Sequence, residues 1–288
     1  MRRVQFFELH EQPWFPPFLR DGMTDALQFG VNLLDSYAPI APLLHDALAS
    51  TRNGTNSDRA NVGRSNVGRS NFGRSNLGRS VVGRSVVDMC SGGGGPWLEL
   101  SRKLPGLQIW LTDKYPNLAA FENVKAASAN GIRFYPGSVD AMAVPLELKG
   151  FRTMFTSFHH FPPEEARAIL QNAVDAGEGI GVFEMPRRAP STIVLTFVFV
   201  FMLFVCTLWI RPFRWSRLFW TYLVPILPVV LLFDGVVSCL RTYRPQELRE
   251  MVSRVAAREY QWEIGECSGG MAPITYLIGY PRGVSDVC

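Results

Sequence analysis

The chain has 288 residues, of which 47% are hydrophobic and 19% charged, so it is long and apolar enough to bury the core of one large domain or two small ones. Its net charge of +4 is mild and its arginines lie in local groups, so the composition does not support nucleic-acid binding. Five scattered cysteines without CxxC spacing argue against a zinc site or a disulfide framework and predict a reducing compartment. The first residues contain no long apolar stretch, so we expect no secretory signal.

Residues 1–52 are expected to form an N-terminal helical segment. The apolar stretch from Val4 to Leu9 predicts a short strand, and the residues that follow predict helices over about 23–37 and 40–49. We consider two roles for this segment, a pair of packing helices and a lid over a pocket. The pattern favours ordinary packing.

Residues 53–85 are predicted to be a low-complexity linker. Positions 61–85 repeat a five-residue unit, as NVGRS, NVGRS, NFGRS, NLGRS and VVGRS. The unit is faintly similar to that of pentapeptide-repeat β-solenoids, but five units barely complete one coil, and a solenoid needs several stacked coils to bury a core. The basic, serine-rich and glycine-rich composition therefore favours a flexible connection that runs into the next strand.

Strand and helix patterns alternate from residue 86 to about residue 184. We predict strands at 84–89, 108–112, 132–135, 152–157 and 179–184, and helices at 97–104, 117–129 and 163–176. This order is typical of a parallel, doubly wound α/β sheet. After residue 240, a helical pattern precedes two strand-like stretches, YQWEIGEC and APITYLIGYP, which predict a closing hairpin of the sheet.

Two apolar runs interrupt the α/β pattern at 191–240. The first, 191–210, carries no charge, and as a helix it would be about 30 Å long, the thickness of the hydrocarbon layer. The second, 218–240, contains two prolines, Pro225 and Pro228, which are expected to kink it. We predict a membrane helical hairpin that either spans the bilayer or dips in and returns. A soluble, apolar cap or a dimer surface is the alternative.

The charges around this hairpin add two expectations. Arginines flank both ends of the insertion and also fill the loop RPFRWSR at its centre, so the positive-inside rule does not choose a side for the loop. Asp234 is the only charge in the second run, and a carboxylate at mid-bilayer costs about 2.5–3.5 kcal/mol. We therefore expect Asp234 near a helix end or facing the interior of the bundle.

The stretch VVDMCSGGGGPWLEL, residues 86–100, predicts a ligand site. An apolar strand ends at Asp88, four glycines follow, and a helix begins after them. Glycine costs about 1 kcal/mol relative to alanine in a regular element, so four in a row predict a close approach of another group to the backbone. Such a loop at a helix N-terminus is typical of nucleotide sites, with a plain tight turn as the alternative. Asp113, which ends the next strand, either accepts hydrogen bonds from ribose hydroxyls or caps a helix.

This segment resembles the class I S-adenosylmethionine-dependent methyltransferases. The family's first motif, D/E-x-G-x-G-x-G, is matched from Asp88 to Gly94, with Cys90 in place of the first glycine. Its second acid matches Asp113, its adenine loop is similar to GSVD at 137–140, and its fourth-strand motif is similar to FHHF at 158–161. The adenine loop departs from the family because Ser138 replaces the usual aspartate.

The resemblance covers residues 86–190 and 241–288, the two parts of the predicted methyltransferase domain. It implies a Rossmann-like sheet of seven strands, parallel except for one antiparallel strand, with the hydrophobic hairpin inserted at 191–240. A dinucleotide oxidoreductase is disfavoured, because its G-x-G-x-x-G fingerprint needs a different glycine spacing.

The implied cofactor is S-adenosylmethionine. The resemblance implies that it is bound by Asp88, Cys90, Ser91, Gly92, Gly93, Gly94, Asp113, Lys114, Ser138, Val139, Asp140, Ser157 and Phe158. The alternative for Asp140 is that it is a solvent-exposed acidic residue of a loop and binds no cofactor.

Two histidines are the candidate catalytic residues. His159 and His160 have side chains whose ordinary pKa lies near neutral pH, so either suits a proton acceptor, although one of them could instead pack beneath the cofactor. Glu184 is a further candidate base, with a salt bridge to Arg187 or Arg188 as the alternative. We predict no metal.

Together these features predict a membrane-bound methyltransferase with its catalytic domain on the cytoplasmic side. The bilayer is its expected partner, and the position of the hairpin suggests an apolar or lipid-like methyl acceptor. We expect no nucleic-acid partner. A membrane-tethered module that binds S-adenosylmethionine without catalysis, and a membrane scaffold that uses the repeat as an interaction arm, are the alternatives.

Overall fold

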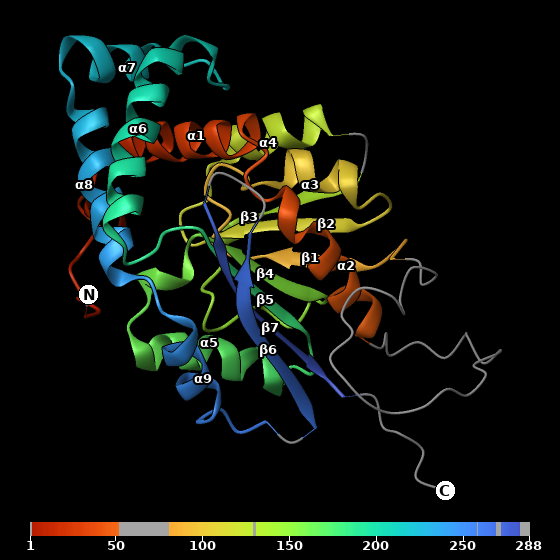
Figure 1. Ribbon diagram of the computed structural model, residues 1–288. Coiled ribbons are helices and arrows are strands. Elements are labelled where there is room, and N and C mark those ends of the chain that lie inside the picture. Colours follow the sequence, from red (N-terminus) through yellow and green to blue (C-terminus); the bar gives the residue numbers. More distant parts are fainter. Residues whose placement is uncertain (1, 52–80, 129–130, 258, 269–271, 283–288) are drawn as a thin grey trace, which may run out of the picture.

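The computed structural model describes residues 2–51, 81–128, 131–257, 259–268 and 272–282, so most of the predicted linker lies outside the described residues. The strands of the described part are β1 Ser85–Asp88, β2 Gln108–Asp113, β3 Ile132–Ser138, β4 Phe151–Phe155, β5 Ile180–Glu184, β6 Tyr260–Cys267 and β7 Ile274–Pro281. They form one seven-stranded sheet in the order β3-β2-β1-β4-β5-β7-β6, and β7 runs antiparallel to both of its neighbours (Figure 1). The predicted doubly wound sheet with one antiparallel strand is therefore confirmed.

The helices surround this sheet. Those of the described part are α1 Pro17–Leu33, α2 Ala41–Ser50, α3 Trp97–Lys103, α4 Leu118–Ala127, α5 Pro163–Asp175, α6 Pro190–Cys206, α7 Trp215–Leu218, α8 Ile226–Arg241 and α9 Pro245–Val252. Short 3₁₀ or π turns are η1 Leu9–Glu11, η2 Ala38–Ile40, η3 Phe158–His160, η4 Thr207–Trp209 and η5 Phe219–Leu223. The helices expected after β1, β2 and β4 are present at nearly the expected positions.

Alternating side chains of the buried strands divide the core into two layers. In β1, Val86 packs with the apolar residues of α2, α3 and α4, whereas Val87 packs with those of α5 and α9. Successive side chains of a strand point to opposite faces, so each β1 residue serves one layer. This three-layer arrangement places the ends of the parallel strands, and the loops that follow them, along one edge of the sheet.

Two expectations for the N-terminal segment were wrong. Residues 4–8 form no strand, because they lie against the end of α8, where Val4 N–H donates to the Leu240 carbonyl at 3.2 Å, and not beside a sheet edge. Helix α1 begins at Pro17, six residues before the expected start. Proline is tolerated in the first turn of a helix because its missing N–H would have no partner there, so WFPPF opens this helix instead of preventing it.

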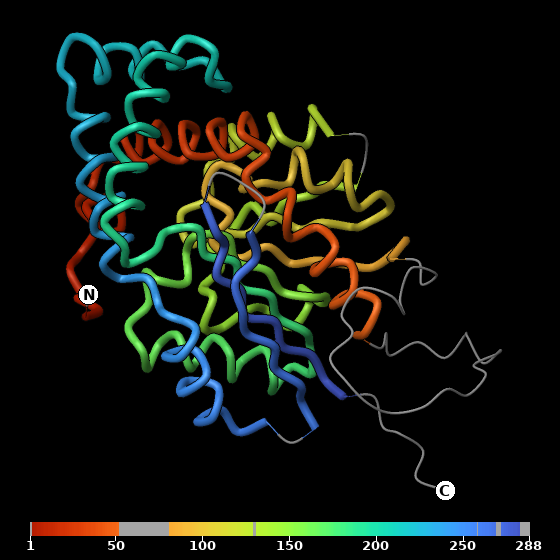
Figure 2. The backbone as a smooth tube through the Cα atoms, viewed as in Figure 1, coloured from red at the N-terminus to blue at the C-terminus, as the bar shows by residue number. Residues whose placement is uncertain are grey.

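The apolar insertion forms a helical hairpin. Helices α6 and α8 lie side by side along one flank of the molecule, joined through α7 and η5 (Figures 1 and 2). The chain bends by 81° between residues 215–223 and 226–241, which confirms the kink expected at Pro225, whereas Pro228 lies in the first turn of α8 and does not interrupt that helix. Within the described residues one helix, 190–209, is long and apolar enough to cross a membrane, and the bent pair would be a second.

A third apolar cluster joins the hairpin to α1. The buried members of the cluster are Phe15, Leu19, Met23, Ala26, Val200, Leu203, Ile210, Leu227, Val230 and Leu231. The inner side of the hairpin therefore packs on the N-terminal helix, whereas only 17% of the apolar window of α6 is buried. The described residues leave the outer side of α6 uncovered.

Candidate functional site

The loop after β1 has a backbone that suits glycine. Gly92 and Gly94 have φ values of +55° and +107°, which are left-handed conformations that other residues rarely adopt. Cys90 also has a φ of +55°, although it carries a side chain. A residue with a side chain therefore stands at a position that has a glycine conformation, at a cost of about 1–2 kcal/mol.

Asp88 holds this loop to the sheet. Its Oδ1 accepts a hydrogen bond from the Thr153 hydroxyl of β4 and its Oδ2 accepts one from the Ser91 hydroxyl, each at 2.7 Å. The carboxyl group is buried, and burial raises its pKa to about 7, although the hydrogen bonds from Ser91 and Thr153 oppose this shift. Its hydrogen bonds link the loop to β4, so Asp88 lies under the loop.

Asp113 connects three segments at the end of β2. Its Oδ2 accepts from the Gly92 N–H and its Oδ1 from the Tyr115 N–H, both at 2.8 Å, while its carbonyl accepts from Val139 N–H at 2.9 Å. The carboxylate thus points at the glycine loop. A carboxylate at this place in an open α/β sheet is positioned to accept hydrogen bonds from a ribose.

The loop after β3 completes this group of residues. The Ser138 hydroxyl donates to the Lys114 carbonyl at 2.8 Å, and Lys114 Nζ lies 3.5 Å from the Asp140 carboxylate. Burial raises the pKa of the Cys90 thiol, and the carboxylates of Asp113, Asp88 and Asp140 raise it further. The structure therefore gathers the candidate residues of β1, β2 and β3 around Cys90.

Helix α1 covers part of the glycine loop. A Cβ at Gly93 would lie 2.5 Å from the carbonyl oxygen of Thr24 in α1, and one at Gly94 would lie 2.7 Å from Val124 in α4. The Asn32 amide of α1 also donates to the Gly95 carbonyl at 2.9 Å. At Gly93 and Gly94 the group that approaches the bare backbone is thus another helix of the same chain.

A second group of candidates lies at the end of β4. Glu184 Oε1 accepts from the backbone N–H groups of Ser157 and Phe158 at 3.0 and 2.7 Å, and its Oε2 lies 2.5 Å from His159 Nδ1. The salt bridges considered for Glu184 do not form. Its neighbours Arg187 and Arg188 pair with Glu266 and Glu247 instead.

The two candidate catalytic histidines differ in exposure. His159 has no exposed surface, whereas 19% of the His160 side chain is exposed and its Nδ1 bonds to Glu11. Burial lowers the pKa of His159, but the adjacent Glu184 and Glu8 carboxylates outweigh this and raise it to about 9. Of the two rings, only His160 is placed where a molecule from solvent can reach it.

Tyr37 lies between the two groups. Its hydroxyl bonds to Thr156, which follows β4. Burial is the main cause that raises the pKa of Tyr37, and the carboxylates of Glu184 and Asp88 raise it further. Thr156 has a φ of +45°, a second left-handed residue with a side chain at this edge of the sheet. Strained backbone of this kind clusters at functional sites.

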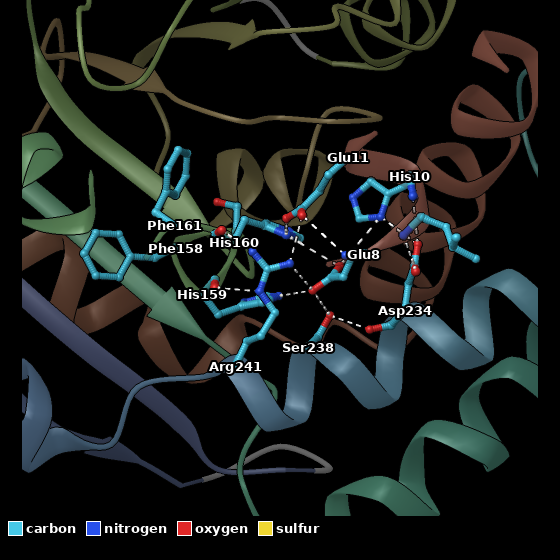
Figure 3. Close-up of polar contacts among 12 residues, drawn as sticks. Glu8, His10, Glu11, Phe158, His159, His160, Phe161, Asp234, Ser238 and Arg241 are labelled. Atoms are coloured by element: carbon cyan, nitrogen blue, oxygen red, sulfur yellow. Dashed lines mark hydrogen bonds and ion pairs between the residues drawn. The ribbon is translucent and has the colours of Figure 1, made fainter. Parts of the chain in front are cut away.

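Sequence reasoning missed most of the residues that surround the histidine pair (Figure 3). They come from the N-terminal segment and α8, and they are Arg3, Glu8, His10, Glu11, Asp234, Ser238 and Arg241. Asp234 accepts from the Leu9 and His10 N–H groups at 2.7 and 3.2 Å, so it faces the interior as expected. Its isolation in an apolar run was the one signal in the sequence, but nothing there named its partners.

Glu8 is the centre of this cluster. It is 1% exposed, and its carboxylate accepts from the Ser238 hydroxyl at 3.1 Å and lies 3.4 Å from the Arg241 guanidinium. Burial raises the pKa of Glu8, but His160, His159 and His10 outweigh this and hold it well below its usual range. The cluster ties the N-terminal segment to η3 and α8.

No family model matches this chain, and no curated protein sequence matches it. Among solved structures, the chain is similar to a putative Zn-dependent alcohol dehydrogenase from Rhodobacter sphaeroides, at 16% identity over 72% of this chain and 88% of that chain, with a TM-score of 0.45. It is also similar to magnesium protoporphyrin IX methyltransferase from Synechocystis with bound SAH, at 13% identity over 70% and 75% of the two chains, with a TM-score of 0.42. It is also similar to the plantazolicin methyltransferase BpumL in complex with SAH, at 11% identity over 69% of this chain and 76% of that chain, with a TM-score of 0.46. Likeness at this level identifies no activity, so the functional argument depends on the residues of this chain.

Proposed function

We propose that this chain is an S-adenosylmethionine-dependent methyltransferase that works at a membrane surface. The observation that carries the proposal is the position of Asp113, which ends β2 and points at Gly92 of the loop after β1. The strand order supports it, because the sheet has the single antiparallel strand that the sequence motifs imply. S-adenosylmethionine would supply an electrophilic methyl group, and the protein would hold the acceptor in line with it and exclude water.

The candidate residues at the ends of β1, β2 and β3 have side chains whose chemistry suits such a cofactor. Each carboxylate oxygen of Asp113 accepts one backbone N–H and has a further lone pair for a ribose hydroxyl, while the exposed Ser138 ends β3 and the half-buried Asp140 lies on the loop after it. The part of the loop at Gly93 is covered by α1, so the nucleoside requires α1 to shift. We infer that the N-terminal segment is a lid. Amide hydrogen exchange in α1, measured with and without S-adenosylmethionine, should change, while that in the buried strand β1 should not.

His160 is the proposed proton acceptor for acceptors that must lose a proton. Its side chain is partly exposed at the carboxyl edge of β4, whereas the buried His159 is held by Glu184 and suits a positioning role. The pair lies on the edge of the sheet where α/β proteins bind their ligands.

The uncovered side of the hairpin supports a membrane partner. The apolar side chains of α6 that are more than half exposed are Val194, Phe197, Val198, Phe201 and Val205. They recur every three or four residues and so form one stripe, and the exposed Trp209 follows Val205 at the same spacing. A contiguous apolar surface of this kind marks an interaction site, and we propose that the bilayer covers it.

The hairpin is proposed to lie in the membrane interface and not to cross the bilayer. Its tip is bonded to the soluble domain, because Arg214 and Arg217 pair with Asp25 of α1, and Arg214 also donates to Asn117 beside α4. A crossing hairpin would have to break these bonds or carry α1 and its charges into the hydrocarbon layer. An apolar stripe beside a polar inner face is typical of interfacial helices. An active site held at this depth suits an apolar or lipid-like acceptor.

Calorimetric titration with S-adenosylmethionine tests the cofactor assignment. The wild type and the control Asp175→Ala, which replaces an exposed carboxylate on α5, should bind, whereas Asp113→Ala should not bind measurably. Equal binding by the Asp113 variant would remove the ribose assignment.

A module that binds S-adenosylmethionine without catalysis is the second candidate function. Two observations favour it, the side chain at the left-handed position 90 and the burial of His159. Transfer of a radiolabelled methyl group to a lipid extract separates the two functions. A protein that binds the cofactor and transfers nothing, while its His160→Gln variant binds equally well, would establish the second.

A further inference from the structure

Three of the four histidines of this chain converge on one buried glutamate. His10 comes from the N-terminal segment and His159 and His160 from η3, and all three rings face Glu8 (Figure 3). The fourth, His45, lies on α2 and, among the described residues, pairs with the adjacent Asp46. Convergence from segments 150 residues apart indicates a built arrangement of metal-ligand side chains.

We propose that Glu8, His159 and His160 bind a divalent transition-metal ion. The ligand atoms of these three residues all lie within 4.8 Å of one another. Glu8 Oε1 is 3.6 Å from His159 Nε2, and Glu8 Oε2 is 3.5 Å from His160 Nδ1. Nitrogen and oxygen ligands at about 2.0–2.2 Å from zinc stand about 3.3 Å apart in a tetrahedral site, so these distances need little adjustment.

His159 has the arrangement of a metal-bound histidine. Its Nδ1 contacts the Glu184 carboxylate at 2.5 Å, and Glu184 is fixed in turn by two backbone N–H groups. A carboxylate on the far ring nitrogen is the usual means of fixing the ring and its tautomer in metal sites. The other nitrogen, Nε2, is fully buried, points toward Glu8 beyond hydrogen-bond distance, and has no hydrogen-bond partner among the described residues. A buried nitrogen without a partner is costly, and an ion would satisfy it.

The charges around the site favour a cation. Four carboxylates face it against two nearby guanidiniums, so these six groups together carry two negative charges, and an ion on His159 takes the place of the proton that Glu184 and Glu8 otherwise stabilise there. The carboxylates are those of Glu8, Glu11, Asp234 and Glu184, and the guanidiniums are those of Arg3 and Arg241. Arg241 competes only weakly for Glu8, at 3.4 Å, because it bonds Glu11 at 2.9 Å and the carbonyls of the histidine pair. A divalent ion would neutralise the remaining charge.

The ligand set indicates which ions bind. Two imidazoles with one carboxylate suit zinc, iron, nickel or cobalt, whereas magnesium and calcium prefer oxygen ligands. His10 and Asp234, whose side chains approach to 2.9 Å, lie on the other side of Glu8 and would orient it. His160 Nδ1 bonds to Glu11, so an ion on this atom would displace that bond and would also prevent the atom from accepting a proton. Metal binding and general-base catalysis are therefore alternative roles for it.

Titration of the chelator-treated protein with Zn²⁺, without cofactor or acceptor, tests the proposal separately from methyl transfer. We expect one ion per chain in the wild type and in His45→Gln, and an affinity reduced by about tenfold or more in His160→Gln. The His160 side chain is 19% exposed, whereas His159 is fully buried, so replacement of His160 is the variant expected to keep the fold, which circular dichroism checks. Zn²⁺ should also raise the thermal midpoint of the wild type and of His45→Gln but not that of His160→Gln.

Cobalt separates this site from the cysteines. Co²⁺ bound by imidazole and carboxylate gives visible absorption bands without the near-ultraviolet charge-transfer band of a cobalt–thiolate bond. We expect visible bands that His160→Gln removes and His45→Gln retains. A thiolate band, equal Zn²⁺ affinity in the two variants, or no binding by the wild type would each overturn the proposal.

Discussion

Arg217 and Asp25 form an ion pair at 2.9 Å in which the side chains are 2% and 0% exposed. The arginine belongs to α7 at the tip of the apolar hairpin, and the aspartate belongs to α1, which also lies against the glycine loop. One buried carboxylate thus connects the proposed membrane element to the helix that covers the candidate cofactor site. Arg214 donates to the same carboxylate at 2.7 Å.

Asp25→Asn should therefore destabilise the protein strongly. Removal of one partner from a buried pair leaves an uncompensated charge and costs about 3–5 kcal/mol. The matched control is Asp35→Asn, because Asp35 pairs with Lys103 at 2.7 Å on the surface, where a pair contributes about 1 kcal/mol or less. Denaturant unfolding followed by tryptophan fluorescence measures both variants. Equal losses would show that the buried pair does not hold the hairpin.

The position of the hairpin tip can be tested by labelling. Ser216 is exposed in α7 at the tip, and Ser253 is exposed after α9 in the domain. With the native cysteines replaced by alanine, Ser216→Cys and Ser253→Cys should react equally with a membrane-impermeant maleimide in sealed vesicles whose protein domain faces outward. Reaction of the Ser216 variant only after detergent is added would mean that the hairpin crosses the bilayer.

The outer stripe of α6 should determine vesicle binding. Phe201 is 68% exposed on this stripe, and Leu146 is 82% exposed on the loop between β3 and β4. Phe201→Glu places a charge where the apolar layer is proposed and should lower partitioning to vesicles by about tenfold or more in a flotation assay. Leu146→Glu makes the same kind of change elsewhere and should have no effect. A similar response of both variants would show that the stripe does not determine binding to the membrane.

The sequence predicted the sheet well because its signals are local. Val86 and Val87 alternate between two cores, and each strand ends near a turn residue or a polar residue, so the order of elements could be derived from neighbouring residues. The meeting of residues at the carboxyl ends of β1 and β2 could be predicted for the same reason, and Asp113 does lie beside Gly92.

The histidine cluster could not be predicted in this way. Glu8, His10 and Asp234 meet only because the N-terminal segment lies across α8, and contacts between residues more than 200 positions apart leave no periodic pattern. The sequence allowed a lid over a pocket but did not place it over Gly93, since α1 precedes the linker and returns to the loop in space. Both depend on the packing of the hairpin against α1.

Cys90→Gly should be more stable than Cys90→Ala. Both variants lose the thiol, but only glycine adopts a φ of +55° without strain, and the expected difference is about 1 kcal/mol after the larger chain entropy of unfolded glycine is subtracted. Cys267 in the extended strand β6 provides the control, because there the order should reverse and alanine should be favoured. Thermal unfolding of the four variants measures the two differences. Alanine favoured at both positions would show that the loop is not strained at residue 90.

Asp88→Asn should change how stability depends on pH. The native pKa of about 7 is above the value near 3.9 expected in the unfolded chain, so between these values the native state binds more protons. The contribution of Asp88 to stability is therefore fully present below about pH 4 and is lost as the pH rises toward 7, on the order of a few kcal/mol in total. Asparagine cannot ionise and can keep hydrogen bonds to Ser91 and Thr153. The unfolding free energy of the variant minus that of the wild type should thus increase from pH 4 to 7 and level off above it. The exposed Asp175→Asn should give a flat difference over the same range, and a flat or decreasing difference for Asp88→Asn would mean that this carboxyl group is ionised in the native loop at low pH.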